Sequence, residues 1–179
     1  MGLQPFQPLT GREGLSDTDM VRDVFEASYR RLVGQLYGVC GDLTEAEEVV
    51  AEAFARAVQH QRTFVHLDNP EAWLRTVAVN VSRTRFRWRR LAAARGGDEV
   101  RHPALDDDRL VLIAALRKLP AAQREAIALH YLADLPIHEV AAATGSPVGT
   151  VKARLSRGRA ALAVLLADIY DSSEEARHG

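Results

Sequence analysis

The sequence predicts an all-α protein in which a short flexible linker joins two small helical domains. Three observations indicate this fold class: apolar residues recur at helical spacing, capping residues and prolines mark helix starts, and residues 96–106 form a polar gap punctuated by glycine and proline. The expected organisation is a disordered arm at 1–18, a first domain at 19–95, the linker at 96–106, a second domain at 107–168 and a disordered tail at 169–179.

Three helices are expected in the first domain. The first spans residues 19–39, where apolar residues follow a helical period. Thr44 and Glu47 form a capping-box pattern, which predicts a second helix ending near residue 59. Asn69 and Pro70 place a capping residue before a proline in the first helical turn. The third helix should therefore begin there and extend to about residue 94.

The third predicted helix becomes strongly basic towards its end. Residues 72–97 contain no acid, and Phe86 and Trp88 alternate with the arginines. Arginine neutralises phosphates and aromatic rings stack on unpaired bases, so this combination indicates a surface for single-stranded nucleic acid. The alternative is that Trp73 and Phe86 belong to the core and the arginines to a solvated surface.

The second domain should contain four helices, at residues 110–119, 120–132, 136–145 and 147–168. The last two flank Gly145, which can adopt a positive φ, and they form a helix-turn-helix. Ser146 is expected to cap the final helix, with Pro147 in its first turn. Val151 and Leu155 are spaced to face a core, whereas the cations fall largely on other faces: Lys152, Arg154, Arg157 and Arg159. This basic surface can meet phosphates and base edges.

Charge is unevenly distributed along the 179 residues, although the formal net charge is only -1. Acids gather in residues 42–52, 106–108 and 171–175, away from the basic segments. Because a phosphate backbone responds to the local field, the pattern favours nucleic-acid binding by two basic surfaces with separate acidic ones.

Composition narrows the remaining possibilities. No apolar run is long enough to cross a bilayer, and residues 1–19 do not resemble a signal peptide, so we expect a cytoplasmic protein without membrane insertion. Cys40 is the single cysteine, which excludes an internal disulfide, and it is expected to be a buried or half-buried small residue. No histidine or cysteine spacing indicates a metal site, and no cofactor is expected.

Together the two halves resemble the extracytoplasmic-function (ECF) sigma factors of bacterial RNA polymerase, over about residues 25–165. Residues 119–126 and 147–155 are similar to sigma region 4 almost residue for residue. Residues 45–54 are similar to region 2.2, and residues 72–80 to the start of the promoter-reading helix. The short connection between the halves fits this group, which lacks region 3.

The resemblance implies a role for each half. The first would bind the β′ clamp helices of core RNA polymerase through Glu48 and Glu52, and the second would bind the β flap. An anti-sigma factor is a further expected partner. The residues that would contact the minus-35 element of the promoter are Thr150, Lys152, Arg154 and Arg157. The residues that would contact the minus-10 element, including a base flipped from the non-template strand, are Asn80, Arg83, Arg85, Arg87 and Trp88.

Four positions depart from the family pattern. Ala51 stands where glutamine is usual, and Thr84 where aspartate is common. Ser156 and Gly158 replace bulkier residues in the recognition helix. These differences affect polymerase contacts and promoter sequence rather than the function itself.

Two other classes of function explain the sequence less well than promoter recognition. A stand-alone helix-turn-helix regulator is the alternative, but it leaves the aromatic and arginine-rich third helix unexplained. An enzyme is disfavoured because the sequence has no phosphate loop or nucleophile motif and its histidines form no spaced set. No catalytic residue is therefore assigned.

Overall fold

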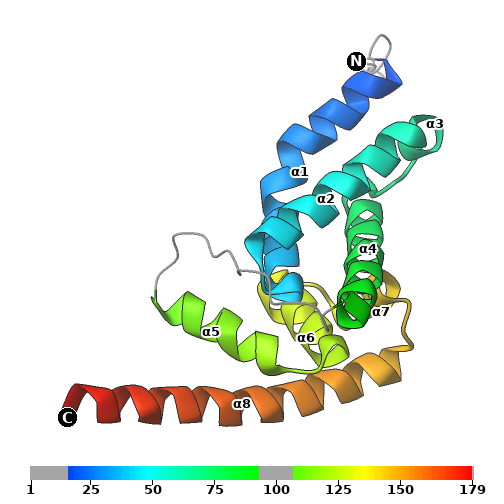
Figure 1. Cartoon of the computed structure of the whole chain (residues 1–179). Helices are drawn as coiled ribbons and strands as arrows, with labels where there is room; N and C mark the ends of the chain where they lie inside the picture. Colours follow the sequence, from blue (N-terminus) through cyan, green and yellow to red (C-terminus); the bar gives the residue numbers. More distant parts are fainter. Residues whose placement is uncertain (1–15, 93–106, 179) are drawn as a thin grey trace, which may run out of the picture.

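The computed structural model describes residues 16–92 and 107–178, and within these ranges the chain is helical without strands. The all-α prediction is confirmed. Figure 1 shows the first half above the second, with the last helix, α8, running along the base of the molecule. The predicted linker at 96–106 and most of the predicted arm at 1–18 lie outside the described residues.

The first half consists of α1 (Asp17–Cys40), α2 (Leu43–Gln59), the short α3 (Gln61–Phe64) and α4 (Pro70–Ala92). The sequence predicted three of these, and α3 is additional. Asn69 caps α4 as predicted, because its side-chain oxygen accepts a hydrogen bond from the Ala72 amide at 2.9 Å.

The start of α1 differs from the sequence prediction. Ser16 and Asp19 form a reciprocal capping box, so the helix begins at Asp17, inside the range predicted as a disordered arm. The Asp19 amide donates to the Ser16 hydroxyl oxygen at 3.2 Å. The Ser16 hydroxyl, at 2.9 Å, and the Ser16 amide, at 3.2 Å, both donate to the Asp19 carboxylate, and these hydrogen bonds lower the pKa of that carboxyl. Residues 17 and 18 are therefore helical, and the rest of the predicted arm before residue 16 lies outside the described residues.

The predicted capping box at the start of α2 is wrong. The N-cap residue is Asp42, whose carboxylate accepts a hydrogen bond from the Glu45 amide at 2.8 Å. Thr44 and Glu47 both lie inside the helix. Aspartate is as good an N-cap as threonine, and its earlier position starts the helix sooner.

The second half consists of α5 (Asp107–Lys118), α6 (Ala121–Ile127), α7 (Ile137–Thr144) and α8 (Val148–His178). A π-helical turn, η2 (Ala128–Leu132), continues α6, so the helix predicted at 120–132 is present with a change of winding. The final helix runs to His178, through most of the range 169–179, for which the sequence predicted a disordered tail.

The turn between α7 and α8 is a Schellman motif. Gly145 adopts φ 58° and ψ 33°, the left-handed conformation predicted for it. Its amide donates to the Ala142 carbonyl at 3.2 Å, and the Ser146 amide donates to the Ala141 carbonyl at 3.0 Å. The helix-turn-helix is therefore present as predicted.

Ser146 takes a different role from the predicted one. Its hydroxyl donates to the Thr144 carbonyl at 3.3 Å and accepts a hydrogen bond from Arg154 at 2.8 Å, instead of capping the amides of α8. Ser146 thus links the turn between α7 and α8 to the second turn of α8.

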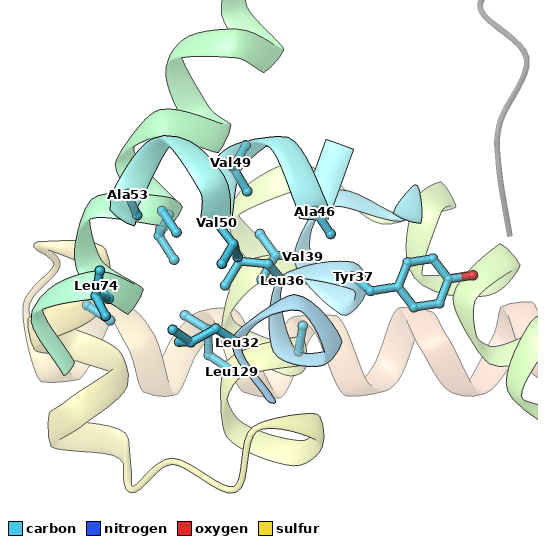
Figure 2. Packing of buried hydrophobic residues seen from close by; sticks show 14 of the residues in the cluster. Leu32, Leu36, Tyr37, Val39, Ala46, Val49, Val50, Ala53, Leu74 and Leu129 are labelled. Atoms are coloured by element: carbon cyan, nitrogen blue, oxygen red, sulfur yellow. The ribbon is translucent and has the colours of Figure 1, made fainter. Parts of the chain in front are cut away.

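The two halves share one continuous hydrophobic core. It joins Leu32 and Leu36 of α1, Val50 of α2 and Leu74 of α4 to Leu129 of η2 in the second half (Figure 2), all of them fully or almost fully buried. The predicted domains are both present, and they pack directly on each other.

A glycine sets the distance between the halves where α1 meets η2. Gly38 is buried, and a Cβ atom there would lie 2.6 Å from Leu132 Cδ1 and 3.1 Å from Ala128 Cβ. Gly34, one turn earlier on the same helix, is exposed and has open space around the corresponding position. Glycine at 38 therefore permits a close approach, and a Cβ there would require the Leu132 side chain to move and the Ala128 contact to widen.

In the part of the chain that the structure describes, no helix is both long enough and apolar enough for a membrane crossing.

We expect Gly145→Ala to destabilise the protein by about 1 to 2 kcal/mol, because a Cβ in the left-handed conformation meets the following carbonyl. Space is not the cause, since no atom lies within 4 Å of that Cβ position. Gly145→Asn is the control, because asparagine tolerates this conformation and should lose less. Urea unfolding of both variants measures the difference, and equal losses would contradict the explanation.

Candidate nucleic-acid interface

The first turns of α8 present the basic surface predicted from the sequence. Val151 and Leu155 are buried, and they pack α8 against the hydrophobic core. Lys152 and Arg157 are exposed, whereas Thr150 and Arg154 are half-buried. The Arg154 guanidinium is held by Ser146, as described above. Two exposed cations and two half-buried polar side chains thus lie on the first turns of α8, an arrangement that suits the major groove of DNA.

A second exposed surface lies on the C-terminal half of α4. Asn80, Arg87 and Trp88 are exposed, with 67% of the Trp88 surface accessible. Phe86 is 42% exposed, so the interpretation of this ring as core is wrong, whereas Trp73 packs partly buried against the core. The Phe86 ring instead has the Arg124 guanidinium 5.8 Å from its centroid. An exposed indole beside arginine suits the stacking of an unpaired base.

Arg83, which was predicted to hold the DNA backbone, donates hydrogen bonds to residues of the second half. Its Nε lies 3.0 and 3.1 Å from the two carboxylate oxygens of Glu125, and a terminal nitrogen lies 2.6 Å from one of them. The other terminal nitrogen donates to the Thr144 carbonyl at 2.7 Å. These hydrogen bonds to Glu125 raise the pKa of Arg83, outweighing the opposing effect of burial.

Arg85 is likewise engaged, in this case with the acids of α2. It pairs with Glu48, and its guanidinium nitrogens lie 3.7 Å from Glu45 and 3.6 Å from Glu52. The expectation of acidic surfaces separate from the basic ones is therefore wrong here, because helix packing joins charges that lie far apart in the sequence. The predicted polymerase-binding acids and a predicted DNA-binding arginine form a single cluster.

Arg124 makes a contact that the sequence analysis did not identify. This buried residue of α6 donates from Nε to the Val39 carbonyl at 2.7 Å and from a terminal nitrogen to the Arg117 carbonyl at 3.4 Å. Both carbonyls lie in the last turns of helices, where no intrahelical donor is available. Desolvation lowers the pKa of Arg124. Residues 119–126 stand out in the sequence only through their similarity to region 4, and no local signal there indicates a contact 85 positions away.

The predicted site residues form one group on α4 and one on α8. These two groups lie closer to each other than their separation in the sequence suggests. Arg83 of α4 contacts Thr144, which directly precedes the turn leading into α8. The C-terminal half of α4 therefore lies against α7, the helix that precedes α8 (Figure 1). No group of three or more metal-ligating side chains lies together in residues 16–92 and 107–178.

Comparison with protein families gives a match for each half. Residues 24–91 match sigma-70 region 2, and residues 109–162 match sigma-70 region 4. The class of protein defined by the fold and by these matches is thus a two-region sigma-70-type protein.

Two relatives identify the group within this class. The chain is 32% identical over 160 residues to the ECF RNA polymerase sigma factor EcfG of Rhodopseudomonas palustris, covering 83% of this chain and 86% of that protein. It is 30% identical over 172 residues to the ECF RNA polymerase sigma factor SigW of Bacillus subtilis, covering 86% and 92%. The chain belongs to the ECF sigma factors. Its relatives are sigma factors, which are not enzymes.

Solved structures agree with this placement. The sigma factor RpoE of Bartonella quintana, in complex with the anti-sigma factor NepR, matches with a TM-score of 0.68 at 29% identity, over 84% of this chain and 98% of that one. CnrH, in complex with the cytosolic domain of CnrY, shares the fold with a TM-score of 0.62 at 24% identity, over 84% and 90%.

Proposed function

We propose that this sigma factor binds core RNA polymerase and reads promoters with two surfaces, the first turns of α8 for the minus-35 element and the C-terminal half of α4 for the minus-10 element. The observation that carries this proposal is the presence, in one chain, of an exposed basic recognition helix and an exposed aromatic and basic helix. The first suits duplex DNA and the second suits an unpaired strand.

At the minus-35 element, Lys152 and Arg157 have the freedom to reach bases or phosphates because both are exposed. Arg154 is preorganised by Ser146, so its contact would be geometrically defined. Thr150, at the start of the helix, is placed to contact the backbone or a base edge.

At the minus-10 element, Asn80 supplies an amide that can read the edge of a flipped base, and Trp88 supplies a face for stacking. In residues 72–88, Arg75 pairs with Glu71, Arg83 with Glu125 and Arg85 with Glu48. Arg87 is exposed and lies outside these three pairs, so it can take a phosphate at once. Arg83 and Arg85 contribute once they leave their acidic partners.

Contacts with core polymerase are assigned to Glu48 and Glu52 for the β′ clamp helices, and to the second half for the β flap. Glu48 is half-exposed although it pairs with Arg85, and Glu52 also pairs with Arg56 at 2.6 Å. Both carboxylates retain accessible surface for a partner.

The remaining assignments follow from the kind of protein proposed. The similar sigma factor bound to the anti-sigma factor NepR supports an anti-sigma factor as a partner here, with control by masking of the two reading surfaces. The protein would act in the cytoplasm, without catalytic residues, cofactor or metal of its own. A stand-alone helix-turn-helix regulator is not favoured, because the first half matches region 2.

Reconstituted transcription tests the proposed function. The purified chain, mixed with core RNA polymerase and genomic DNA of its source, should produce transcripts with defined start sites that core polymerase alone does not make. Transcript mapping gives the promoters, and their shared upstream sequences give the minus-35 and minus-10 elements. Random initiation in both reactions would contradict the proposal.

We expect Lys152→Ala and Arg157→Ala to weaken binding to the promoters so identified. A lost base contact should cost about 1 to 3 kcal/mol and relax preference at one position, whereas a lost phosphate contact should reduce the salt slope. Arg62→Ala, which removes an exposed cation from α3, is the control. Holoenzyme titrations over a range of salt concentrations measure these effects, and wild-type behaviour of both variants would exclude α8 as the reading helix.

Asn80→Ala should separate duplex binding from strand opening. We expect unchanged affinity for minus-35 duplex but slower open-complex formation, with a loss of about 1 to 3 kcal/mol for the missing base contact. A template already mismatched over the start site should recover part of the loss, since unpairing no longer has to be offset. Permanganate footprinting of both templates reports this directly. Equal opening by variant and wild type would remove Asn80 from the mechanism.

A further inference from the structure

The Ser146 side chain connects the end of α7 to α8 by one hydrogen bond in each direction. Its hydroxyl donates to the Thr144 carbonyl at 3.3 Å, and its oxygen accepts from a terminal nitrogen of Arg154 at 2.8 Å. A serine hydroxyl has a single proton, so the oxygen offers only acceptor positions once the carbonyl has taken that proton. The backbone of α7 therefore sets the direction in which Ser146 accepts from Arg154.

The position of the Ser146 oxygen is fixed by the turn between the two helices. Gly145 adopts the left-handed conformation, and the Ser146 amide donates to the Ala141 carbonyl at 3.0 Å. One staggered torsion then places the hydroxyl oxygen relative to this backbone. All of these groups belong to α7, the turn and α8, so the arrangement is formed within the second half alone.

Arg154 lies at the edge of the buried face of α8. That face is marked by Val151, Leu155 and Gly158, which are buried, whereas Arg154 is half-buried. Ser146 precedes Arg154 by about two helical turns, so their contact draws the arginine side chain back towards the N-terminus of α8. When a helix enters the major groove, side chains at such an edge meet the phosphates of the groove wall, and the outward side chains meet base edges.

We propose that Ser146 is a positioning residue for promoter binding, which holds the Arg154 guanidinium ready to take one backbone phosphate of the minus-35 element. This role rests on the proposed function, because that function gives the first turns of α8 to this element. The Ser146 contact uses one of the five N–H donors of a guanidinium, so donors for a bidentate phosphate contact remain. A phosphate contact at this edge fixes the register in which the exposed Lys152 and Arg157 meet the bases.

Ser146→Ala should weaken binding without changing its dependence on salt. A mobile arginine side chain loses conformational freedom when it binds a phosphate, whereas Arg154 has already lost much of that freedom in its contact with Ser146. Without the hydroxyl the loss occurs on binding, and we expect the affinity to fall about two- to tenfold. The guanidinium keeps its charge, so the slope of log affinity against log salt concentration should remain that of the wild type.

Arg154→Ala should give the complementary result. It removes the phosphate contact itself, so we expect a lower affinity and a salt slope reduced by about one, with an unchanged base preference. Adding Ser146→Ala to Arg154→Ala should cause no further loss, because the hydroxyl then has no guanidinium to position. Holoenzymes made with each variant are titrated with duplexes that carry the minus-35 element of a mapped promoter, and with single-base changes of that element.

A second substitution at the same position is the matched control. Ser146→Thr retains a hydroxyl, so it should retain wild-type affinity. Urea unfolding measures how far each variant destabilises the protein, and the double variant separates this effect from positioning. A loosened turn would weaken binding by the same factor with and without Arg154, whereas a positioning role requires Arg154.

The free protein provides a readout that does not involve DNA. NMR relaxation of the arginine Nε–H groups measures how ordered each guanidinium is on the picosecond to nanosecond timescale. We expect Arg154 to be ordered in the wild type and in Ser146→Thr, and mobile in Ser146→Ala. The exposed Arg157 should be mobile in all three proteins.

Three results would overturn this role for Ser146. They are an Arg154 side chain as mobile in the wild type as in Ser146→Ala, an equal loss of affinity on Ser146→Ala with and without Arg154, and a changed base preference in Arg154→Ala. In each case the wild type would still direct promoter-specific transcription. Absence of defined start sites with the wild type would instead contradict the proposed function, and the role of Ser146 with it.

Discussion

The structure depends on a reciprocal exchange of arginines between its two halves. An α-helix leaves its last carbonyls without intrahelical donors, and α1 and α7 both end at the seam. Gly41 and Gly145 turn the chain there in the left-handed conformation, and the αL and Schellman bonds satisfy some of these carbonyls. The Val39 and Thr144 carbonyls are not used by these bonds, and Arg124 and Arg83 reach across to them, with the Ser146 hydroxyl as a second donor to Thr144. The packing of the halves thereby supplies a donor to one terminal carbonyl of each helix.

Local chemistry in the sequence was sufficient to predict most of the helices and the recognition turn. The start of α4 and the end of α7 are set by Asn69, Pro70 and Gly145. Each acts through its own backbone conformation or a nearby amide, so a few consecutive residues are enough to predict these helix ends. The error at Thr44 arose within such a window, because two good capping residues lie two positions apart and only one can start the helix. Helix α3 is too short for an apolar period to reveal.

The candidate site was predicted less completely, since its electrostatics depend on contacts across long sequence separations. Lys152, Arg157, Asn80 and Trp88 are exposed, as DNA-contacting side chains should be. Arg83 and Arg85 looked equally available, because residues 72–97 contain no acid. Their partners, Glu125 and Glu48, come from other helices 42 and 37 positions away. Charge that is segregated along a chain can thus be neutralised in the fold.

The close approach at Gly38 has a consequence for the evolution of the family. The requirement for glycine at this position comes from Leu132 and Ala128 in the other half, rather than from the turn or fold of the first half alone. A side chain at 38 is therefore selected against only in a lineage whose halves pack in this way. Among related sigma factors, the residue aligned with Gly38 would record which lineages have kept this packing and which have lost it.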